Sequence, residues 1–242
     1  MHKYFLLLLL SVSFYNCKKA NTTAMHITIT DSVNYTAPDT TIVYKNYLAL
    51  GDSYTIGQSV TASENFPAQT VQLLNQLNTK FTQPEIIAQT GWTTTNLLNK
   101  INNTPPLKPT YDIVTLLIGV NNQYQGLSLQ QYSNEFTILL NKAIQLANNK
   151  PQHVIVLSIP DYSVTPFVNA ANKAYVANQI DSFNAVNASI AQQVNVQYLN
   201  ITPSTRLAAN NTSLLAPDML HPSAIEYKKW ADSLQRKISA VL

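Results

Sequence analysis

From residue 46 onward, short apolar runs alternate with longer segments in which apolar residues recur at helical spacing. The five short runs are Tyr47–Leu50, Ile86–Ala88, Ile113–Ile118, Val154–Ile159 and Val196–Leu199. Each run has the length of a β-strand, and the third and fourth are apolar at all but one position, as is typical of strands covered on both faces. The pattern therefore predicts five strands.

The longer segments between these runs predict helices. Their apolar positions are Phe66, Val71, Leu74 and Leu77; Leu97, Leu98 and Ile101; Tyr132, Phe136, Leu139, Leu140, Ala143 and Leu146; and Ala174, Ala177, Ile180, Phe183, Val186 and Ile190. A last helix has its apolar stripe at Tyr227, Trp230, Leu234 and Ile238. Ser223 and Glu226 form a capping-box pattern at its start. Strict alternation of strands and helices predicts one α/β domain, with a mostly parallel sheet and helices on both faces.

Polar segments follow the strands of the predicted sheet. They are Gly51–Ser53, Gln89–Trp92, Gly119–Asn122 and Pro160–Tyr162, and a further polar segment, Asp218–Pro222, precedes the last helix. Ligands bind at the carboxyl ends of the strands in such sheets. We therefore expect these segments to converge at one edge of the sheet.

Three residues of these segments suit nucleophilic catalysis. Serine is a weak nucleophile that needs a nearby base, and the base is best held by a third group. Ser53 is the candidate nucleophile, although it could equally cap a helix. His221 is the candidate base, because His153 begins its strand and is expected at the opposite end of the sheet. Asp218 lies three residues before His221 and could orient its imidazole, but a plain helix-capping loop remains the alternative.

Two further residues could stabilise the negative oxygen that forms on attack. Gly91 lets its backbone approach a ligand closely, and Asn121 carries a side-chain amide donor. An ordinary turn glycine and an ordinary loop asparagine are the alternatives. Trp92 could line the pocket or cover the core. Asp52 is expected to support the turn beside the pocket rather than to react.

Composition excludes other kinds of function. The chain has 242 residues, of which 45% are hydrophobic and 11% charged, and a net charge of +3. Nucleic-acid binding depends on clustered Lys and Arg, and the chain has only short pairs such as Lys18-Lys19. No clustering of His, Cys or carboxylate residues resembles a zinc site. We therefore expect no nucleic-acid partner, no metal and no organic cofactor.

The first 45 residues resemble an export signal followed by a tether. Residues 1–17 comprise a short basic start, an apolar stretch of signal-peptide length and the only cysteine, Cys17. This arrangement resembles a bacterial lipoprotein signal, in which Cys17 would be lipidated. Tyr15 and Asn16 are larger than the residues usually found before that cysteine, so a plain secretion signal or an uncleaved anchor stays open. Residues 18–45 are rich in Thr and Asn, and residues 46–242 form the predicted domain.

Four sequence blocks resemble those of the SGNH hydrolases, also called the GDSL esterase/lipase family. The blocks are LALGDSYTIG, AQTGWTT, TLLIGVNN and DMLHPS; they occur in the family's order and span residues 48–223. The resemblance implies a flavodoxin-like three-layer α/β/α sandwich. It also implies that Ser53, His221 and Asp218 form a catalytic triad, and that the Ser53 amide, Gly91 and Asn121 form an oxyanion hole. Asn122 departs from the Asp that many members have there, so the hydrogen bonding of that pocket loop is expected to differ.

These observations predict a serine esterase that works through an acyl-enzyme. The expected substrates are small acyl esters, such as acetyl groups on carbohydrates, because no long apolar lid is evident. A lysophospholipase, a thioesterase and a non-catalytic glycan-binding surface protein are the alternatives. We expect an exported protein whose only membrane contact is a lipid anchor at Cys17.

Overall fold

A computed structural model describes residues 42–77 and 79–242 of the chain. Its five strands are β1 (Tyr47–Gly51), β2 (Glu85–Ala88), β3 (Ile113–Leu117), β4 (Val154–Leu157) and β5 (Gln197–Leu199). They form one sheet in the order β2-β1-β3-β4-β5, and all neighbouring strands are parallel. The predicted α/β fold is confirmed, and every predicted strand is present.

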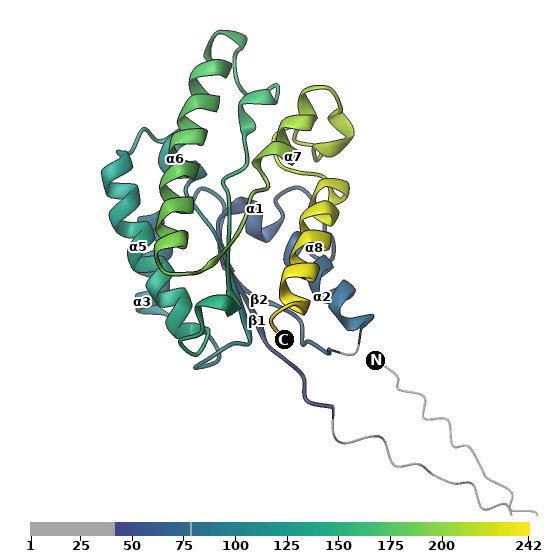
Figure 1. Cartoon of the computed structure of the whole chain (residues 1–242). Coiled ribbons are helices and arrows are strands. Elements are labelled where there is room, and N and C mark those ends of the chain that lie inside the picture. The colour runs from purple at the N-terminus through teal and green to yellow at the C-terminus, as the bar shows by residue number, and fades with distance from the viewer. Residues whose placement is uncertain (1–41, 78) are drawn as a thin grey trace, which may run out of the picture. The chain divides into compact units, whose positions relative to one another are not determined.

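Helices cover both faces of this sheet (Figure 1). One face carries α2 (Phe66–Asn75) and α8 (Ala224–Ser239), which pack against each other. The other face carries α3 (Thr94–Asn103), α5 (Leu129–Leu146) and α6 (Lys173–Gln193). The three central strands, β1, β3 and β4, are therefore buried along their whole length, whereas β2 and β5 at the edges are mostly half-buried. This burial explains why the central strands have almost entirely apolar sequences.

In the last helix, one predicted local contact is replaced by others within the same helix. Its apolar stripe is buried as expected, and Ser223 is its N-cap. Glu226 does not complete the predicted capping box. Its Oε1 accepts a hydrogen bond from the indole nitrogen of Trp230 (2.8 Å), and its Oε2 lies 2.9 Å from Nζ of Lys229. A buried indole N–H requires a partner, and Glu226 supplies it.

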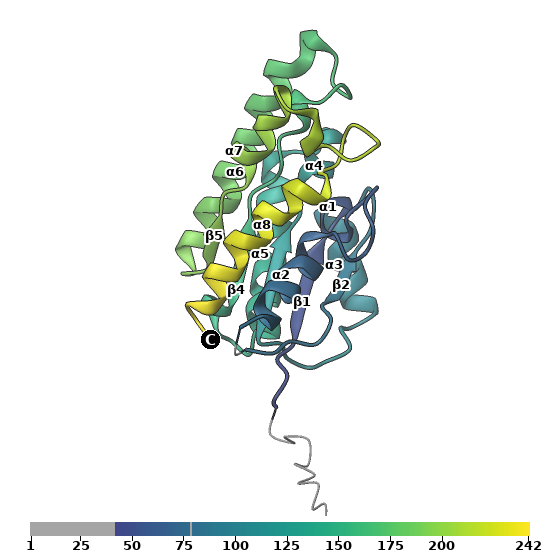
Figure 2. The same cartoon turned by 90° about the vertical axis from the view of Figure 1, so that its right-hand side faces the viewer.

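Short elements gather where the strands end. They include α1 (Ser53–Ile56) after β1, α4 (Val120–Tyr124) after β3 and the 3₁₀ turn η2 (Tyr162–Val164) after β4, with α7 (Thr202–Arg206) after β5. Figure 2 shows α1, α4 and α7 towards the same end of the sheet. The chain's C-terminus lies at the opposite end. The expected convergence of the polar segments is therefore present.

The start of the domain lies slightly earlier than the sequence predicts. Lys45, assigned above to the tether, pairs with Phe81 in a parallel bridge. The signal segment, Cys17 and residues 18–41 of the tether lie outside the described residues. Of the helices in the described ranges, none combines the length and apolar character that a membrane crossing requires.

Candidate active site

The turn after β1 fixes the position of Ser53. A side chain at Gly51 would lie 2.5 Å from the carbonyl oxygen of Leu117, so only glycine fits between β1 and β3. Asp52 is the N-cap of α1, and its Oδ1 accepts a hydrogen bond from the amide of Tyr54 (3.0 Å). Ser53 is thus the first residue of the helix and not its cap, so its hydroxyl is free for another partner.

That partner is the imidazole of His221. The Ser53 hydroxyl oxygen lies 2.9 Å from Nε2 of His221, although 168 residues separate the two in sequence. Nδ1 of His221 lies 2.7 Å from Oδ2 of Asp218. The ionised carboxylate accepts a hydrogen bond from Nδ1–H, which leaves Nε2 free to accept the serine hydroxyl proton. The ring of Tyr54 packs against the imidazole, with 4.9 Å between the ring centroids.

Asp218 is itself held by several hydrogen bonds. Its Oδ1 accepts from the amides of Leu220 and His221 (3.0 Å each), and its Oδ2 also accepts from the hydroxyl of Ser59 (2.7 Å). Partial burial alone would raise the pKa of Asp218. The bonds from Ser59 and His221 outweigh that effect and lower the pKa to about 2. The carboxylate of Asp218 is therefore ionised at neutral pH, where it can orient the imidazole.

Ser59 is a site residue that sequence reasoning missed. It lies in the loop after α1, and 159 residues separate it from Asp218. Its backbone has a φ of 67°, in the left-handed region that non-glycine residues seldom adopt. No motif in the sequence marks this serine, because the contact depends on how two distant loops meet.

The predicted oxyanion donors face the same cavity as Ser53 and His221. As the first residue of α1, Ser53 has a backbone amide without an acceptor inside that helix. Gly91 lies in the turn after β2, and Asn121 lies in α4. Nδ2 of Asn121 donates to the carbonyl of Trp92 (3.0 Å), which fixes the amide plane while its second N–H remains.

Close packing of Gly119 sets the place of Asn121. Gly119 precedes α4 with a φ of 132°, and a side chain there would come within 2.6 Å of the ring of Tyr132. The chain therefore enters α4 directly above the core. The three donors and the Ser53–His221–Asp218 contacts thus lie around one cavity.

The cavity encloses about 520 Å³ and is open to solvent. Its apolar wall consists of Tyr54, Val120, Tyr124, Tyr162, Phe167 and Leu220. Tyr124, Tyr162 and Phe167 pack against one another, with ring centroids 5.9 to 6.3 Å apart. The cavity is suited to a small neutral group beside Ser53.

Three residues expected at the pocket do not line this cavity. Trp92 is half-buried against the core, which was one of its two expected positions. Asn122 is fully buried: its Oδ1 accepts from the amide of Thr94 (3.0 Å), and its Nδ2 donates to that residue's hydroxyl (2.7 Å). Asn122 therefore joins α4 to α3. Because its amide is bound to Thr94 in the interior, it faces away from the cavity.

Asp52 also lies in the interior. It is fully buried, and its Oδ2 has no hydrogen-bond partner among the described residues. Burial raises the pKa of Asp52 to about 7, and the hydrogen bond from the Tyr54 amide offsets only part of that rise. Asp52 supports the nucleophile turn, as expected, but from beneath the cavity.

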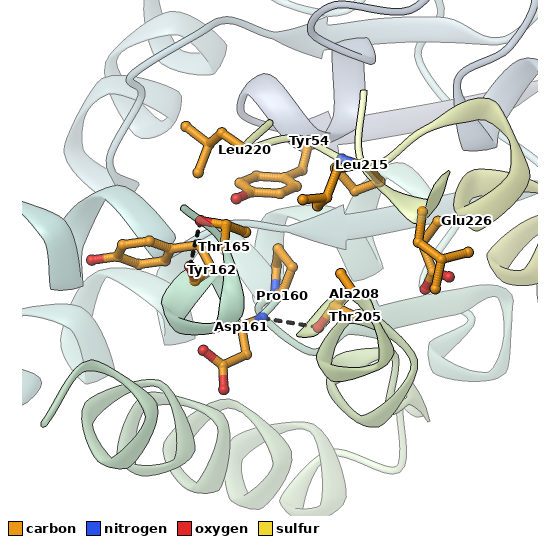
Figure 3. A pocket seen from close by; sticks show the side chains of 12 residues that line it. Tyr54, Pro160, Asp161, Tyr162, Thr165, Thr205, Ala208, Leu215, Leu220 and Glu226 are labelled. Carbon is orange, nitrogen blue, oxygen red and sulfur yellow. Dashed lines mark hydrogen bonds between the residues drawn. The ribbon is translucent and has the colours of Figure 1, made fainter. Parts of the chain in front are cut away.

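A second, narrower pocket lies beside the cavity and shares Tyr54, Tyr162 and Leu220 with it (Figure 3). The η2 loop that forms one wall is tied down by Thr165, whose hydroxyl donates to the carbonyl of Tyr162 (2.8 Å). Buried Asp161 anchors the same loop, because its Oδ2 accepts from Nε of Arg206 (2.8 Å). These contacts hold Tyr162 in place at the cavity wall.

The described residues include no cluster of three or more His, Cys, Asp or Glu side chains placed to bind a metal ion. The acid–base groups around the cavity are those of Asp218 and His221 together with the tyrosine hydroxyls. His221 is placed to activate the Ser53 hydroxyl, and the donors that face the cavity are placed to stabilise an oxyanion.

Comparisons with known proteins identify the family and the fold of this chain. The sequence profile of the GDSL-like lipase/acylhydrolase family matches residues 49–229. No curated protein sequence matches the chain at a significant level. Among solved structures, a lipase/acylhydrolase from Enterococcus faecalis has 15% identity and a TM-score of 0.66, covering 81% of this chain and 96% of its own.

Two further structures are similar over the same extent. An acetylxylan esterase from Geobacillus stearothermophilus has 18% identity and a TM-score of 0.62, covering 81% of this chain and 95% of its own. TesA has 16% identity and a TM-score of 0.60, covering 82% of this chain and all of its own. At these identities the similarity shows the fold. The profile match over most of the chain shows that it belongs to the GDSL-like lipase/acylhydrolase family, and it is a carboxylic ester hydrolase.

Proposed function

We propose that Ser53 attacks the carbonyl carbon of an ester while its hydroxyl proton passes to Nε2 of His221. The carbonyl electrons move to the oxygen, which the Ser53 amide, Gly91 and Asn121 stabilise. When the carbonyl re-forms, the C–O bond to the alcohol breaks, and His221 returns the proton to the leaving oxygen. The observation that carries the proposal is the contact between Ser53 and His221.

A water molecule then completes the reaction. It attacks the acyl carbon as His221 removes its proton. Collapse of the second oxyanion breaks the bond to the Ser53 oxygen, which takes the proton back from His221, and the carboxylic acid is released. The ionised Asp218 stabilises the imidazolium in both steps. Every proton is returned, so the cycle consumes only ester and water.

We further propose that the acyl group is small, such as acetyl on a carbohydrate. The support is the aromatic wall of Tyr124, Tyr162 and Phe167 beside Ser53, because flat aromatic rings suit the faces of sugar rings. One structurally similar protein is named as an acetylxylan esterase, which is consistent with this substrate class.

A substrate panel tests both proposals. We expect hydrolysis of p-nitrophenyl acetate to exceed that of the octanoate and palmitate esters, and Ser53→Ala to abolish it. Acetylated oligosaccharides, lysophospholipids and acyl thioesters complete the panel. A preference for lysophospholipids or thioesters would overturn the carbohydrate proposal, and a fully active Ser53→Ala variant would overturn the mechanism.

The location of the enzyme is a separate proposal that rests on sequence alone. We propose export and lipid anchoring through Cys17, because a lone cysteine follows an apolar segment of signal length. Expression in a bacterial host with a labelled fatty acid should label the wild-type protein and not Cys17→Ala. Equal labelling, or a soluble wild-type protein without label, would overturn it.

A further inference from the structure

A groove continues from the candidate active site across its aromatic wall. Tyr124 and Tyr162 line both the catalytic cavity and this groove, which has about 870 Å³ of open space. The other lining residues are Gln123, Gly126, Leu127, Asn172, Tyr175, Val176, Gln179 and Phe183. They come chiefly from α4 and the loop after it on one side and from the start of α6 on the other. Because Tyr124 and Tyr162 border both spaces, the groove lies directly beside the catalytic cavity.

A row of hydrogen bonds runs along the groove. The Tyr162 hydroxyl donates to Oε1 of Gln123, and Nε2 of Gln123 donates to Oε1 of Gln179. Nε2 of Gln179 then donates to the hydroxyl of Tyr175. Each of these bonds is 2.7 Å long. The row fixes the orientation of both amides, so the groove presents polar groups that are already in place.

The row leaves donors available to a ligand. The Tyr175 hydroxyl accepts from Gln179 and keeps its own proton, and each glutamine amide has a second N–H. The Tyr175 side chain is 63% exposed, whereas Gln123 is buried. Tyr175 is therefore the member of the row that a ligand meets first.

The lining is neutral. None of the described residues that line the groove carries a formal charge at pH 7. The nearby Lys173, on the first turn of α6, does not line the groove, and its ammonium group donates a hydrogen bond to the carbonyl of Val164 (3.2 Å). A phosphate or carboxylate ligand would normally find Arg or Lys in its site. A long acyl chain would offer no acceptor to the second N–H of either amide, and a covered polar group without a partner is costly. Amide and hydroxyl groups beside flat tyrosine rings instead suit a neutral polyhydroxyl ligand.

We propose that this groove binds the sugar units that flank the esterified sugar, so that the substrate is an acetylated neutral oligosaccharide. The inference rests on the proposed esterase function and adds a specificity-determining residue, Tyr175, to it. The acetyl group lies beside Ser53, and the sugar chain crosses Tyr124 and Tyr162 to reach Tyr175.

The test compares three substrates: p-nitrophenyl acetate, an acetylated monosaccharide and an acetylated neutral tetrasaccharide such as acetylated xylotetraose. We expect the wild-type protein to have a higher kcat/KM for the tetrasaccharide than for the monosaccharide. Tyr175→Ala should lower the tetrasaccharide value by about three- to tenfold, mainly through KM. The same variant should hydrolyse p-nitrophenyl acetate and the monosaccharide at the wild-type rate.

Two further variants sharpen the test. Tyr175→Phe keeps the ring and loses the hydroxyl, so its tetrasaccharide KM should fall between those of the wild type and Tyr175→Ala. Tyr44→Ala removes another exposed tyrosine (53%) that does not line the groove, and it should leave all three rates unchanged.

The outcomes separate this inference from the proposed function. Equal kcat/KM for monosaccharide and tetrasaccharide, or an unchanged tetrasaccharide KM in Tyr175→Ala, would overturn the proposal that the groove binds sugars. Neither result would contradict the proposed esterase function. A wild-type protein that hydrolyses p-nitrophenyl acetate and neither sugar ester would overturn the groove proposal as well. Failure of the wild type on every ester would overturn the proposed function itself.

Discussion

At the scale of single residues, the surroundings of Asp218 determine how firmly the imidazole of His221 is held. Two backbone amides and the Ser59 hydroxyl bind this carboxylate besides the imidazole itself. The amides come from Leu220 and His221 in the same loop, whereas Ser59 comes from the loop after α1. Ser59 therefore ties the loop of the base to the loop of the nucleophile.

Loss of the Ser59 hydroxyl tests this tie. Ser59→Gly is the suitable variant, because glycine accepts the left-handed backbone that Ser59 adopts. We expect kcat for p-nitrophenyl acetate to fall about three- to tenfold with little change in KM, since one hydrogen bond to a charged group is lost in a partly solvated place. Ser63→Ala, in the same loop, is the control. Equal kcat values for both variants would show that Ser59 does not position Asp218.

Asp52 gives a prediction about stability and pH. Because the pKa of Asp52 is raised to about 7, its carboxyl group holds a proton more tightly in the folded protein than in the unfolded chain. Its contribution to stability is therefore complete below pH 4 and is lost as the pH rises through 7. Asp52→Asn removes this dependence and keeps an oxygen for the Tyr54 amide.

Thermal or urea unfolding at pH 5 and pH 8 measures the effect of that substitution. Relative to wild type, the free energy of unfolding of Asp52→Asn should rise by on the order of 3 kcal/mol between these two pH values. Asp232→Asn, on the exposed face of α8, should show no such change. A difference that stays constant with pH would contradict the buried, protonated Asp52.

Sequence reasoning located the catalytic candidates better than their supporting residues. Ser53, His221 and Asp218 could be predicted because each follows or precedes a recognisable element and suits one chemical role. Asp52 and Asn122 were expected at the pocket, yet both are buried. The spacing of residues in the sequence predicts that a residue lies near a turn. The direction of its side chain depends on tertiary packing, which the spacing does not reveal.

At the scale of elements, the loop after β4 depends on a link to α7. Asp161 in this loop is nearly fully buried and pairs with Arg206, whose other nitrogen lies 2.7 Å from Asp181 on α6. A buried carboxylate that loses its partner is costly, whereas an exposed ion pair contributes little. The link therefore holds Tyr162 at the boundary between the cavity and the groove.

Arg206→Gln tests this link. We expect it to lower the free energy of unfolding by about 1–3 kcal/mol, because it leaves the buried Asp161 carboxylate with the Ser163 amide as its remaining partner among the described residues. Lys228→Gln breaks an exposed pair with Asp232 on α8 and should change it by less than about 0.5 kcal/mol. Urea unfolding of both variants makes the comparison. Equal effects would contradict a structural role for Arg206.

The elements themselves could largely be predicted from the apolar pattern. All five predicted strands and the long helices are present. They could be predicted because an element that is buried on one or both faces has apolar residues at a regular spacing in the sequence. The ends were less predictable. The apolar runs continue to Ile118 and Ile159, which are buried although β3 and β4 end before them. Burial in a loop and burial in a strand look alike in sequence.

At the scale of the whole molecule, the parallel sheet brings distant segments to one edge. Ser53 follows the first strand and His221 precedes the last helix, yet the sheet order places both at the carboxyl ends of the strands. The groove beside them escaped sequence analysis. Its polar members, Gln123, Gln179 and Tyr175, lie on helices whose sequence pattern shows only the face that packs on the sheet.

The central claim is that Ser53 reacts because His221 removes its proton. A fluorophosphonate probe tests it directly, because the probe forms a covalent bond only with an activated serine. We expect the wild-type protein to be labelled at Ser53 and to lose its esterase activity in step with labelling, whereas Ser53→Ala and His221→Ala stay unlabelled and inactive. Labelling of His221→Ala at the wild-type rate, or esterase activity that survives complete labelling of Ser53, would contradict the account.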